Sequence, residues 1–460
     1  MAARRRLTVR PRAGAARPRA EQRNSPYLDA ARAIATQLVD TALPAPVGVT
    51  WDGDDLLGAT AAEFTVVRKP VGPDLYGGTA GVGWFLGHFA ASTDDRGAGG
   101  VAVAALQSAL AQMQPQPGQS LSLFSGATGV AWAAIDVGER LHHASLRESG
   151  LQLAQHVAAA VQRARDAGGE HDLLGGLAGM AIGLLAIHER TRNPQIREAA
   201  RAAVARLIEA GRRDAFGMSW SDPQNSTAPA LCGLGHGVSG MAWALAEAGW
   251  AAGTEAFEPF VHDALRYERG WFSPDHCAWA DLREPPGGGS SESFPAWTSA
   301  WCHGAFGIGA VRWRLYEKTG DLTALAEATS AIEAARSFVE RAGRLLRDGQ
   351  VSDVTLCHGL GGAIEVMLLG YEVTGERDHL IAARRVGDIC LSIHAANAHR
   401  WTVGLKNAEL VPGLFTGLAG TGVTMLRLHD LGSIASPMLP GRARWTPRLQ
   451  DVQPIASAST

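Results

Sequence analysis

Three features are scarce in this sequence, and each scarcity argues against a class of protein. No apolar run approaches the roughly 18 residues of a membrane-spanning helix, so we expect no membrane span. The five cysteines are odd in number and widely scattered, which does not resemble a disulfide framework and favours a reduced, cytoplasmic setting. Only three lysines stand beside 39 arginines, a bias that indicates a GC-rich bacterial genome more than a mechanism.

Positive charge is concentrated at the N-terminus. Residues 1–23 hold eight arginines and a single acid, Glu21. A basic segment can indicate nucleic-acid contact or a targeting signal, yet no apolar stretch follows that would serve as a secretory core. Its Ala/Pro/Arg composition is typical of disorder. We therefore expect residues 1–23 to be a disordered extension, and we expect no nucleic-acid partner.

A short phrase recurs along the chain: a turn of small residues, then Gly-x-x-Gly, then an apolar helical run. Seven copies begin at glycines that lie 48 to 67 residues apart, namely Gly78, Gly126, Gly176, Gly237, Gly304, Gly359 and Gly417. A near-constant period of this size is the signature of a repeat architecture. No Pro/Gly/Ser-rich linker interrupts the repeats, and 46% of the residues are hydrophobic, so the sequence predicts one domain with a large core.

Each repeat has room for two helices. The stretches after the glycines, such as 180–187 and 241–245, are apolar nearly all round and are predicted to be buried inner helices. Stretches such as 322–345 and 379–394 alternate Arg and Glu with Ala, Leu and Ile, which predicts outer helices. Seven such hairpins predict an all-α fold, an α/α toroid in the form of a double seven-helix barrel.

The boundaries of this domain follow from where the repeats start and stop. We expect an N-terminal helix and cap in residues 24–70, with irregular structure or short strands around Trp51 and residues 64–67. The toroid is predicted to span residues 71–435. Residues 436–460 are predicted to be a disordered tail.

The two residues before the first glycine of each copy, here called the pre-glycine pair, carry the chemistry. In two neighbouring repeats the pair is Cys-His, at 302–303 and 357–358, and the preceding repeat contributes His236. In a closed ring, equivalent positions of neighbouring repeats point at the same place. Cys302, Cys357 and one adjacent histidine form a set suited to zinc, and three protein ligands favour a catalytic site with an open position.

Helix geometry supports this interpretation of the two cysteines. Both are predicted at helix N-termini, where the helix dipole assists thiolate formation. The other three cysteines have no such repeat position, so we interpret Cys232, Cys277 and Cys390 as small buried hydrophobes.

Several motifs together resemble the LanC-like family, the lanthionine cyclases. They are SAWCHGAFGIG (299–309), LCHGLGG (356–362), LYGGTAGVG (75–83), DLLGGLAG (172–179), GHGVSG (235–240) and PGLFTGLAG (412–420). The resemblance covers roughly residues 70–435. WADLR (279–283) is more similar to the cyclase domain of the two-function lanthipeptide synthetases than to nisin-type cyclases. Since the chain lacks room for their dehydratase half, we expect a stand-alone cyclase.

The resemblance implies a double seven-helix toroid with one zinc ion in its central cavity, held by Cys302, Cys357 and His358. It also maps the active-site histidine of the family onto His236 and an acidic residue onto Asp172. The implied reaction adds a peptide Cys thiol to dehydroalanine or dehydrobutyrine and gives a (methyl)lanthionine thioether. The implied partners are a dehydrated precursor peptide and a separate dehydratase.

The chemistry assigns a role to each of these residues. Zinc coordination deprotonates a thiol at neutral pH, and attack on the dehydro-residue leaves an enolate that a general acid must protonate. His236 suits that task by its pKa. Asp172 either orients this histidine, binds substrate, or simply caps a helix, as Asp74 would at the same position of the first repeat.

Two positions depart from the nisin-type pattern. Thr298 stands where those cyclases have an arginine, four residues before the first zinc cysteine. His303 stands where they have a tyrosine. We interpret His303 as a proton-handling or ligand-supporting residue, although it is also an alternative to His358 as the third ligand.

Other functions remain compatible with parts of this pattern. A LanC-like thiol transferase would add glutathione to dehydroamino acids with the same zinc site. A non-catalytic toroid would only bind a peptide. Protein prenyltransferases have six hairpins and an Asp-Cys-His ligand set, and glycoside hydrolases need a pair of carboxylates, so both fit the sequence less well.

Overall fold

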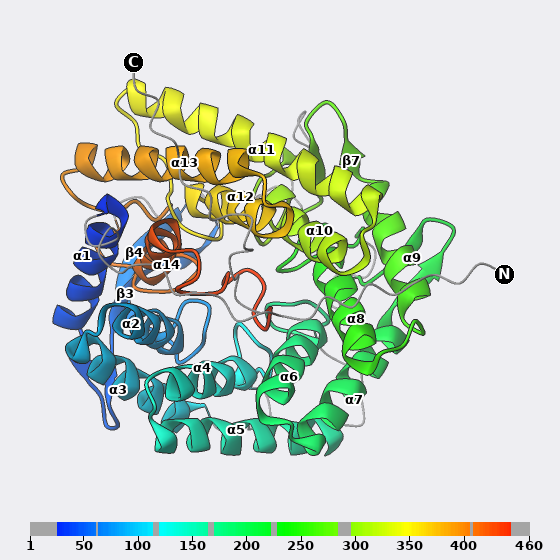
Figure 1. Ribbon diagram of the computed structural model, residues 1–460, viewed down its shortest axis with the longest axis horizontal. Helices are drawn as coiled ribbons and strands as arrows, with labels where there is room; N and C mark the ends of the chain where they lie inside the picture. Colours follow the sequence, from blue (N-terminus) through cyan, green and yellow to red (C-terminus); the bar gives the residue numbers. More distant parts are fainter. Residues whose placement is uncertain are drawn as a thin grey trace.

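The computed structural model describes residues 25–60, 63–113, 119–163, 170–221, 228–283, 296–404 and 408–442. The helices of these residues form two concentric rings (Figure 1). The inner ring consists of α2 (Thr79–Thr93), α4 (Ala127–Arg140), α6 (Leu177–Thr191), α8 (Val238–Ala252), α10 (Ala305–Thr319), α12 (Leu360–Thr374) and α14 (Leu418–His429). The outer ring consists of α1 (Pro26–Asp40), α3 (Arg96–Gln112), α5 (Ala144–Arg163), α7 (Pro194–Ala210), α9 (Glu258–Arg269), α11 (Leu322–Arg347) and α13 (Arg377–Ala396). The predicted double seven-helix toroid is confirmed.

Six of the hairpins are consecutive in the chain, from α2–α3 to α12–α13. The seventh pairs the two ends of the chain, because α1 packs on α14. The Tyr27 hydroxyl of α1 donates to the Asp388 carboxylate of α13 at 2.6 Å and so ties α1 to the neighbouring outer helix. The helix expected in the N-terminal 24–70 segment is therefore the outer helix of the seventh repeat, and α14 contacts α2 to close the inner ring.

The helices of the two rings differ in how much of their surface is buried, as the hydrophobic patterns predict. In α12 every residue from Leu360 to Val373 is buried, because an inner helix has protein on all sides. In α13 only one stripe is buried, which includes Ala383, Val386 and Cys390. Outer helices such as α3 begin at a side-chain cap, where Asp95 accepts from the Ala98 amide at 3.0 Å.

Inner helices begin at glycine instead, because their first turns lie against neighbouring backbone. Gly304 has a φ of 112°, and a Cβ added there would lie 2.2 Å from the Thr298 carbonyl oxygen. Three residues later, a Cβ at Gly307 would lie 2.0 Å from the Trp301 carbonyl oxygen. No other residue type fits at these two positions, which explains the Gly-x-x-Gly spacing.

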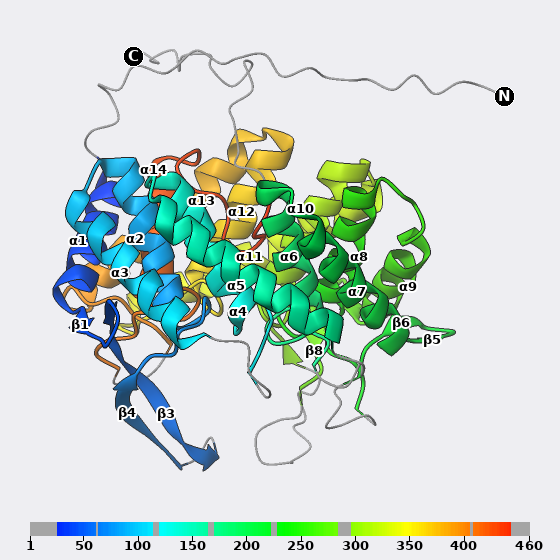
Figure 2. The same cartoon turned by 90° about the horizontal axis from the view of Figure 1, so that it is seen from below.

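The strands are short and lie outside the rings. β3 (Asp52–Thr60) and β4 (Glu63–Pro70) form an antiparallel hairpin that projects from one end of the barrel (Figure 2). The remaining strands are β1 (Leu43–Pro44), β2 (Val49–Thr50), β5 (Arg212–Asp214), β6 (Gly217–Ser219), β7 (Phe272–Ser273), β8 (Ala278–Asp281) and β9 (Ala296–Trp297). The described fold is thus mostly helical, with a cap region that contains the short strands expected around residues 64–67.

The segment after α14 turns inward and crosses the middle of the ring (Figure 1). Ile434, Met438 and Leu439 are buried, and the Ser436 hydroxyl donates to Glu365 of α12 at 2.7 Å. Arg442 pairs with Glu317 at 2.8 Å. The tail expected to begin at residue 436 therefore overlaps a packed segment that reaches Arg442, while residues 1–23 and 443–460 lie outside the described residues.

Candidate metal centre

A closed circle of backbone hydrogen bonds joins the seven turns that precede the inner helices. In every repeat, the first residue of the pre-glycine pair uses its backbone carbonyl to accept a hydrogen bond. The donor is a backbone amide in the turn of the neighbouring repeat. The seven acceptors are the carbonyls of Tyr76, Phe124, Leu174, Gly235, Cys302, Cys357 and Phe415. The donor–acceptor distances include 2.7 Å from the Trp301 amide to Cys357 and 2.9 Å from the Cys357 amide to Phe415. The pre-glycine pairs are therefore held next to one another around one end of the barrel.

Three metal-capable side chains meet on this circle. The donor atoms of Cys302, Cys357 and His358 all lie within 4.8 Å of one another. His358 Nε2 is 3.4 Å from the sulfur of Cys302 and 3.4 Å from that of Cys357. Both cysteines are free thiols, so no disulfide competes for their sulfur atoms. Two thiols and one imidazole that share a common point can hold a metal ion such as zinc.

The close spacing of the three donors shifts their pKa values. Hydrogen bonds from Cys357 and His358 lower the pKa of the Cys302 thiol, against the effect of burial. Burial, followed by the neighbouring Cys302, raises the pKa of Cys357 well above its ordinary value. The hydrogen bond with Cys302 raises the pKa of His358. The cluster thus shares protons among closely spaced donors, and a bound cation would replace those protons.

His236 and Asp172 form a pair beside the cluster. His236 Nδ1 is 2.7 Å from Asp172 Oδ2, and the other carboxylate oxygen accepts from the Gly175 amide at 2.7 Å. Burial disfavours the charged imidazole, but the hydrogen bond and charge of Asp172 outweigh it and raise the pKa of His236. Asp172 thus accepts a hydrogen bond within its own turn through Oδ1, as a helix cap does, while Oδ2 lies at hydrogen-bonding distance from His236.

His303 lies beside His236. Its ring stacks on that of His236, with centroids 5.0 Å apart, and it is not one of the three clustered donors. Burial lowers the pKa of His303 to about 4, and the positive charges of Arg283 and His236 act in the same direction. His303 is thus a buried, neutral imidazole. Nearby, the Thr298 hydroxyl donates to the His303 carbonyl at 2.7 Å and closes the turn.

Sequence reasoning missed two side chains at the centre. The Tyr76 hydroxyl donates to the sulfur of Cys357 at 3.0 Å, and its ring stacks on Phe415. Tyr76 occupies the same position of its repeat as Cys302 and Cys357, so the repeat alignment was the signal that could have found it. The second is Arg283, whose pKa is raised mainly by its hydrogen bonds with Asp281 and to a smaller extent by the charges of Cys302 and Cys357. WADLR was noted as a motif, but without a role for this arginine.

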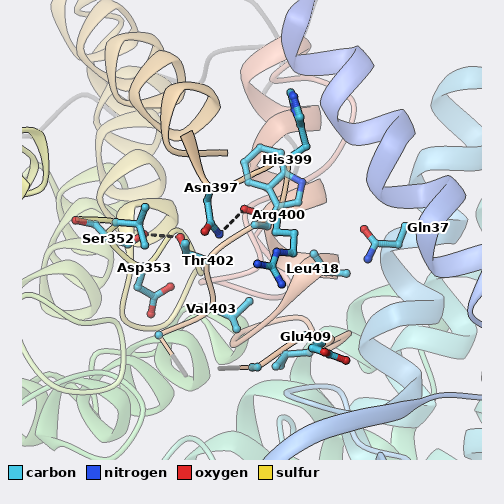
Figure 3. Close-up of a pocket in the computed structure, with 15 residues that line it drawn as sticks. Gln37, Ser352, Asp353, Asn397, His399, Arg400, Thr402, Val403, Glu409 and Leu418 are labelled. Carbon is cyan, nitrogen blue, oxygen red and sulfur yellow. Dashed lines mark hydrogen bonds between the residues drawn. The ribbon is translucent and has the colours of Figure 1, made fainter. Parts of the chain in front are cut away.

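A separate concavity of about 600 Å³ lies next to the segment that leads to Cys357 (Figure 3). It is lined by residues that include Gln37, Asp353 and Arg400, and by none of the three clustered donors. The Thr402 hydroxyl donates to the Ser352 carbonyl across its wall. Asp353 lines this concavity, and its negative charge is one of the smaller causes of the raised pKa of His358. This concavity is therefore distinct from the group of metal-capable donors.

The fold and the donor set define a class: an α/α-toroid protein with a Cys–Cys–His group that can hold a metal ion. Residues 69–440 match the family described as lanthionine synthetase C-like protein, and the chain belongs to that family. A comparison with curated protein sequences found no match. Among the described residues, no helix is both long and apolar enough to cross a bilayer.

Solved structures support the fold. The chain resembles nisin cyclase with a TM-score of 0.57 and 17% identity, over 78% of this chain and 88% of that chain. Lower TM-scores relate it to two hydrolases. The α-1,6-mannanase GH76A of Salegentibacter sp. HEL1_6 has a TM-score of 0.45 and 13% identity, over 88% of this chain and 99% of that chain. An unsaturated glucuronyl hydrolase specific for heparin has a TM-score of 0.43 and 11% identity, over 68% of this chain and 82% of that chain.

Proposed function

We propose that this protein is a zinc-dependent lanthipeptide cyclase. It would add cysteine thiols of a dehydrated precursor peptide to dehydroalanine or dehydrobutyrine and form thioether rings. The observation that carries the proposal is the meeting of Cys302, Cys357 and His358 within 4.8 Å, beside the His236–Asp172 pair. Membership of the lanthionine synthetase C-like family supports it.

In this proposal Cys302, Cys357 and His358 hold the zinc ion. Three protein ligands leave one position of a tetrahedral ion open, which is typical of catalytic sites. Bound zinc supplies a Lewis acid that lowers the pKa of a peptide thiol at that position. Tyr76 steadies the sulfur of Cys357 with its hydroxyl, as groups around metal ligands commonly do.

His236 would deliver the proton that completes the addition. The peptide sulfur forms a bond to the β-carbon of the dehydro-residue, and the electrons of the double bond move toward the α-carbon and its carbonyl. A proton must then reach the α-carbon. Asp172 raises the pKa of His236, which favours the protonated imidazole, and its hydrogen bond to Nδ1 holds the ring in place. His303, neutral and stacked on His236, restricts the motion of that ring.

Counting thiols tests the proposal directly. Cyclisation leaves the peptide mass unchanged, so free thiols in a dehydrated, cysteine-containing peptide would be counted by alkylation, alongside zinc analysis of the protein. We expect wild-type protein to bind about one zinc per chain and to consume thiols. Cys302→Ala should do neither. Cys390→Ala, which removes a buried thiol from outer helix α13, is the matched control and should behave as wild type.

Two other outcomes would change the assignment. If zinc is bound but peptide thiols persist until glutathione is added and captured, the protein is an intermolecular thiol transferase. If the protein binds peptide without consuming any thiol, it is a binding toroid. A wild-type protein free of zinc after metal loading would contradict the ligand assignment itself.

A further inference from the structure

A buried carboxylate of outer helix α9 reaches the turn before α8, which carries His236. Glu268 has no exposed surface, and its Oε1 accepts from the Gly233 amide of that turn at 3.1 Å. Its Oε2 accepts from the Ser239 hydroxyl at 2.5 Å and from Arg312 Nη2 at 2.7 Å. One carboxylate thus joins the turn before α8, the first turn of α8 and the inner helix of the next repeat.

Other repeats bind the equivalent amide with a side chain of the same turn. In the second repeat, Ser120 Oγ accepts from the amide two residues later at 3.3 Å. In the sixth repeat, Asp353 Oδ1 accepts from the amide two residues later at 2.7 Å. The fourth repeat has Leu231 at this position, and a leucine side chain contains no acceptor. Glu268 therefore supplies to Gly233, from an outer helix, the acceptor that the turn itself lacks.

Gly233 also lies directly against the turn of the fifth repeat. It has a φ of 125°, and a Cβ added there would lie 2.5 Å from the Cys302 carbonyl oxygen and 2.8 Å from His303 Cα. The Gly235 amide donates to the same Cys302 carbonyl at 3.1 Å. The turn before α8 is thus fitted to the backbone of the fifth-repeat turn, while Glu268 holds it through the Gly233 amide.

We propose that Glu268 is a positioning residue for His236, because its bond to the Gly233 amide fixes the turn that keeps the imidazole against Asp172. This inference rests on the proposed function. A buried amide that loses its acceptor is unfavourable, so the turn would shift to find another partner. His236 Nδ1 lies 2.7 Å from Asp172, and a displacement of about 1 Å would break that contact and slow proton delivery.

Glutamine at position 268 would break the contact with Gly233 selectively. Two donors, Arg312 and Ser239, converge on Oε2, so the amide oxygen of the glutamine should stay there. Its NH₂ group would then replace Oε1 and face the Gly233 amide, which is also a donor. The variant keeps the shape of the side chain and the neighbours on α8 and α10, and it removes the acceptor from the turn.

Glu365→Gln is the matched control for Glu268→Gln. Glu365 of α12 is also fully buried, and it accepts from Arg427 Nε at 2.8 Å and from the Ser436 hydroxyl at 2.7 Å. Each variant therefore neutralises a buried carboxylate that binds one arginine and one serine. Only Glu268 also accepts from the amide of the turn that carries His236.

The test measures single-turnover thiol loss with a dehydrated peptide, zinc content and thermal unfolding. Affinity would be measured with a saturated peptide in which alanine replaces dehydroalanine. We expect both variants to unfold at lower temperature than wild type and to keep their zinc and their affinity for the saturated peptide. Only Glu268→Gln should slow thiol loss, by about tenfold or more.

A second-site variant tests the contact with Gly233 itself. Leu231→Asp, added to Glu268→Gln, places a carboxylate where Asp353 stands in the sixth repeat, so it should accept from the Gly233 amide. We expect the double variant to recover most of the lost rate. A folded, zinc-loaded double variant that is as slow as Glu268→Gln would contradict the role of this amide.

The outcomes distinguish this inference from the proposed function. Unimpaired thiol loss by Glu268→Gln would overturn the role of Glu268 alone. Equal slowing in Glu268→Gln and Glu365→Gln would also overturn it, since both would then act through general packing. Absence of thiol loss by zinc-loaded wild-type protein would overturn the proposed function and, with it, this inference.

Discussion

The first and third repeats contain the same capped turn, yet the capping aspartate lies at the candidate site only in the third. Asp74 and Asp172 both stand four residues before the first glycine. Asp74 Oδ1 accepts from the Gly77 amide at 2.8 Å, and Asp172 Oδ1 accepts from the Gly175 amide at 2.7 Å. Locally the two aspartates are equivalent.

The difference comes from the repeat that follows each of them. Asp172 faces His236 of the fourth repeat, whereas the equivalent residue in the second repeat is Ser125, whose hydroxyl donates to the Leu174 carbonyl. The same scaffold thus builds a capped turn in one place and an oriented imidazole in another. In this toroid, the neighbouring repeat therefore decides which side chain the capping aspartate faces.

The largest expected difference between repeats comes from two variants at the same position of neighbouring repeats. One removes a proposed metal ligand from the sixth repeat, and the other changes a packing residue of the seventh. Cys357→Ala should abolish zinc binding and thiol loss, because it takes away one of three donors. Phe415→Leu, at the same position of the seventh repeat, should lower the free energy of unfolding by about 1 kcal/mol or more and retain zinc. Metal analysis and thermal unfolding measure the two effects, and loss of zinc from both variants would contradict the separation.

A sharper test compares the two equivalent aspartates. Asp172→Asn keeps an oxygen for the Gly175 amide but removes the negative charge beside His236, so thiol loss should slow by about tenfold or more. Asp74→Asn makes the same change in the first repeat and should leave the rate unaffected. Equal rate losses in the two variants would show that Asp172 acts only as a cap.

The pH dependence of this pair has a definite sign. Asp172 raises the pKa of His236, so the imidazolium persists to higher pH and is lost as the pH rises through that pKa. Without the carboxylate charge the pKa falls, and the alkaline limb of the rate profile should move to lower pH in Asp172→Asn. The same limb should stay in place in Asp74→Asn.

The smallest expected effect concerns Tyr76, the residue of the first repeat that does reach the centre. Tyr76→Phe keeps the stacking on Phe415 and removes the hydrogen bond to Cys357. Zinc affinity, measured by competition with a chelator, should fall by about tenfold. Tyr27→Phe removes a comparable hydroxyl contact in α1 and should leave zinc affinity unchanged. An unchanged affinity in Tyr76→Phe would mean that Cys357 needs no support from the first repeat.

Much of the fold could be predicted because its causes are local. Gly304 and Gly307 are required by contacts within their own turn, and the apolar run of α12 and the striped pattern of α13 report burial directly. The partner of α14 could not be predicted in this way. α1 lies at the other end of the chain, and its own sequence shows only that it is amphipathic.

By itself, the sequence determined the repeats, the inner and outer helices, and which repeats carry thiols and imidazoles, because period and residue type are properties of short segments. Only the tertiary structure decided what these residues meet. It paired Asp172 with His236 and directed the Tyr76 hydroxyl to Cys357. Such contacts depend on closing a ring between segments that are distant along the chain. The sequence shows the chemical type of each side chain, but the residue that it contacts depends on how the ring closes.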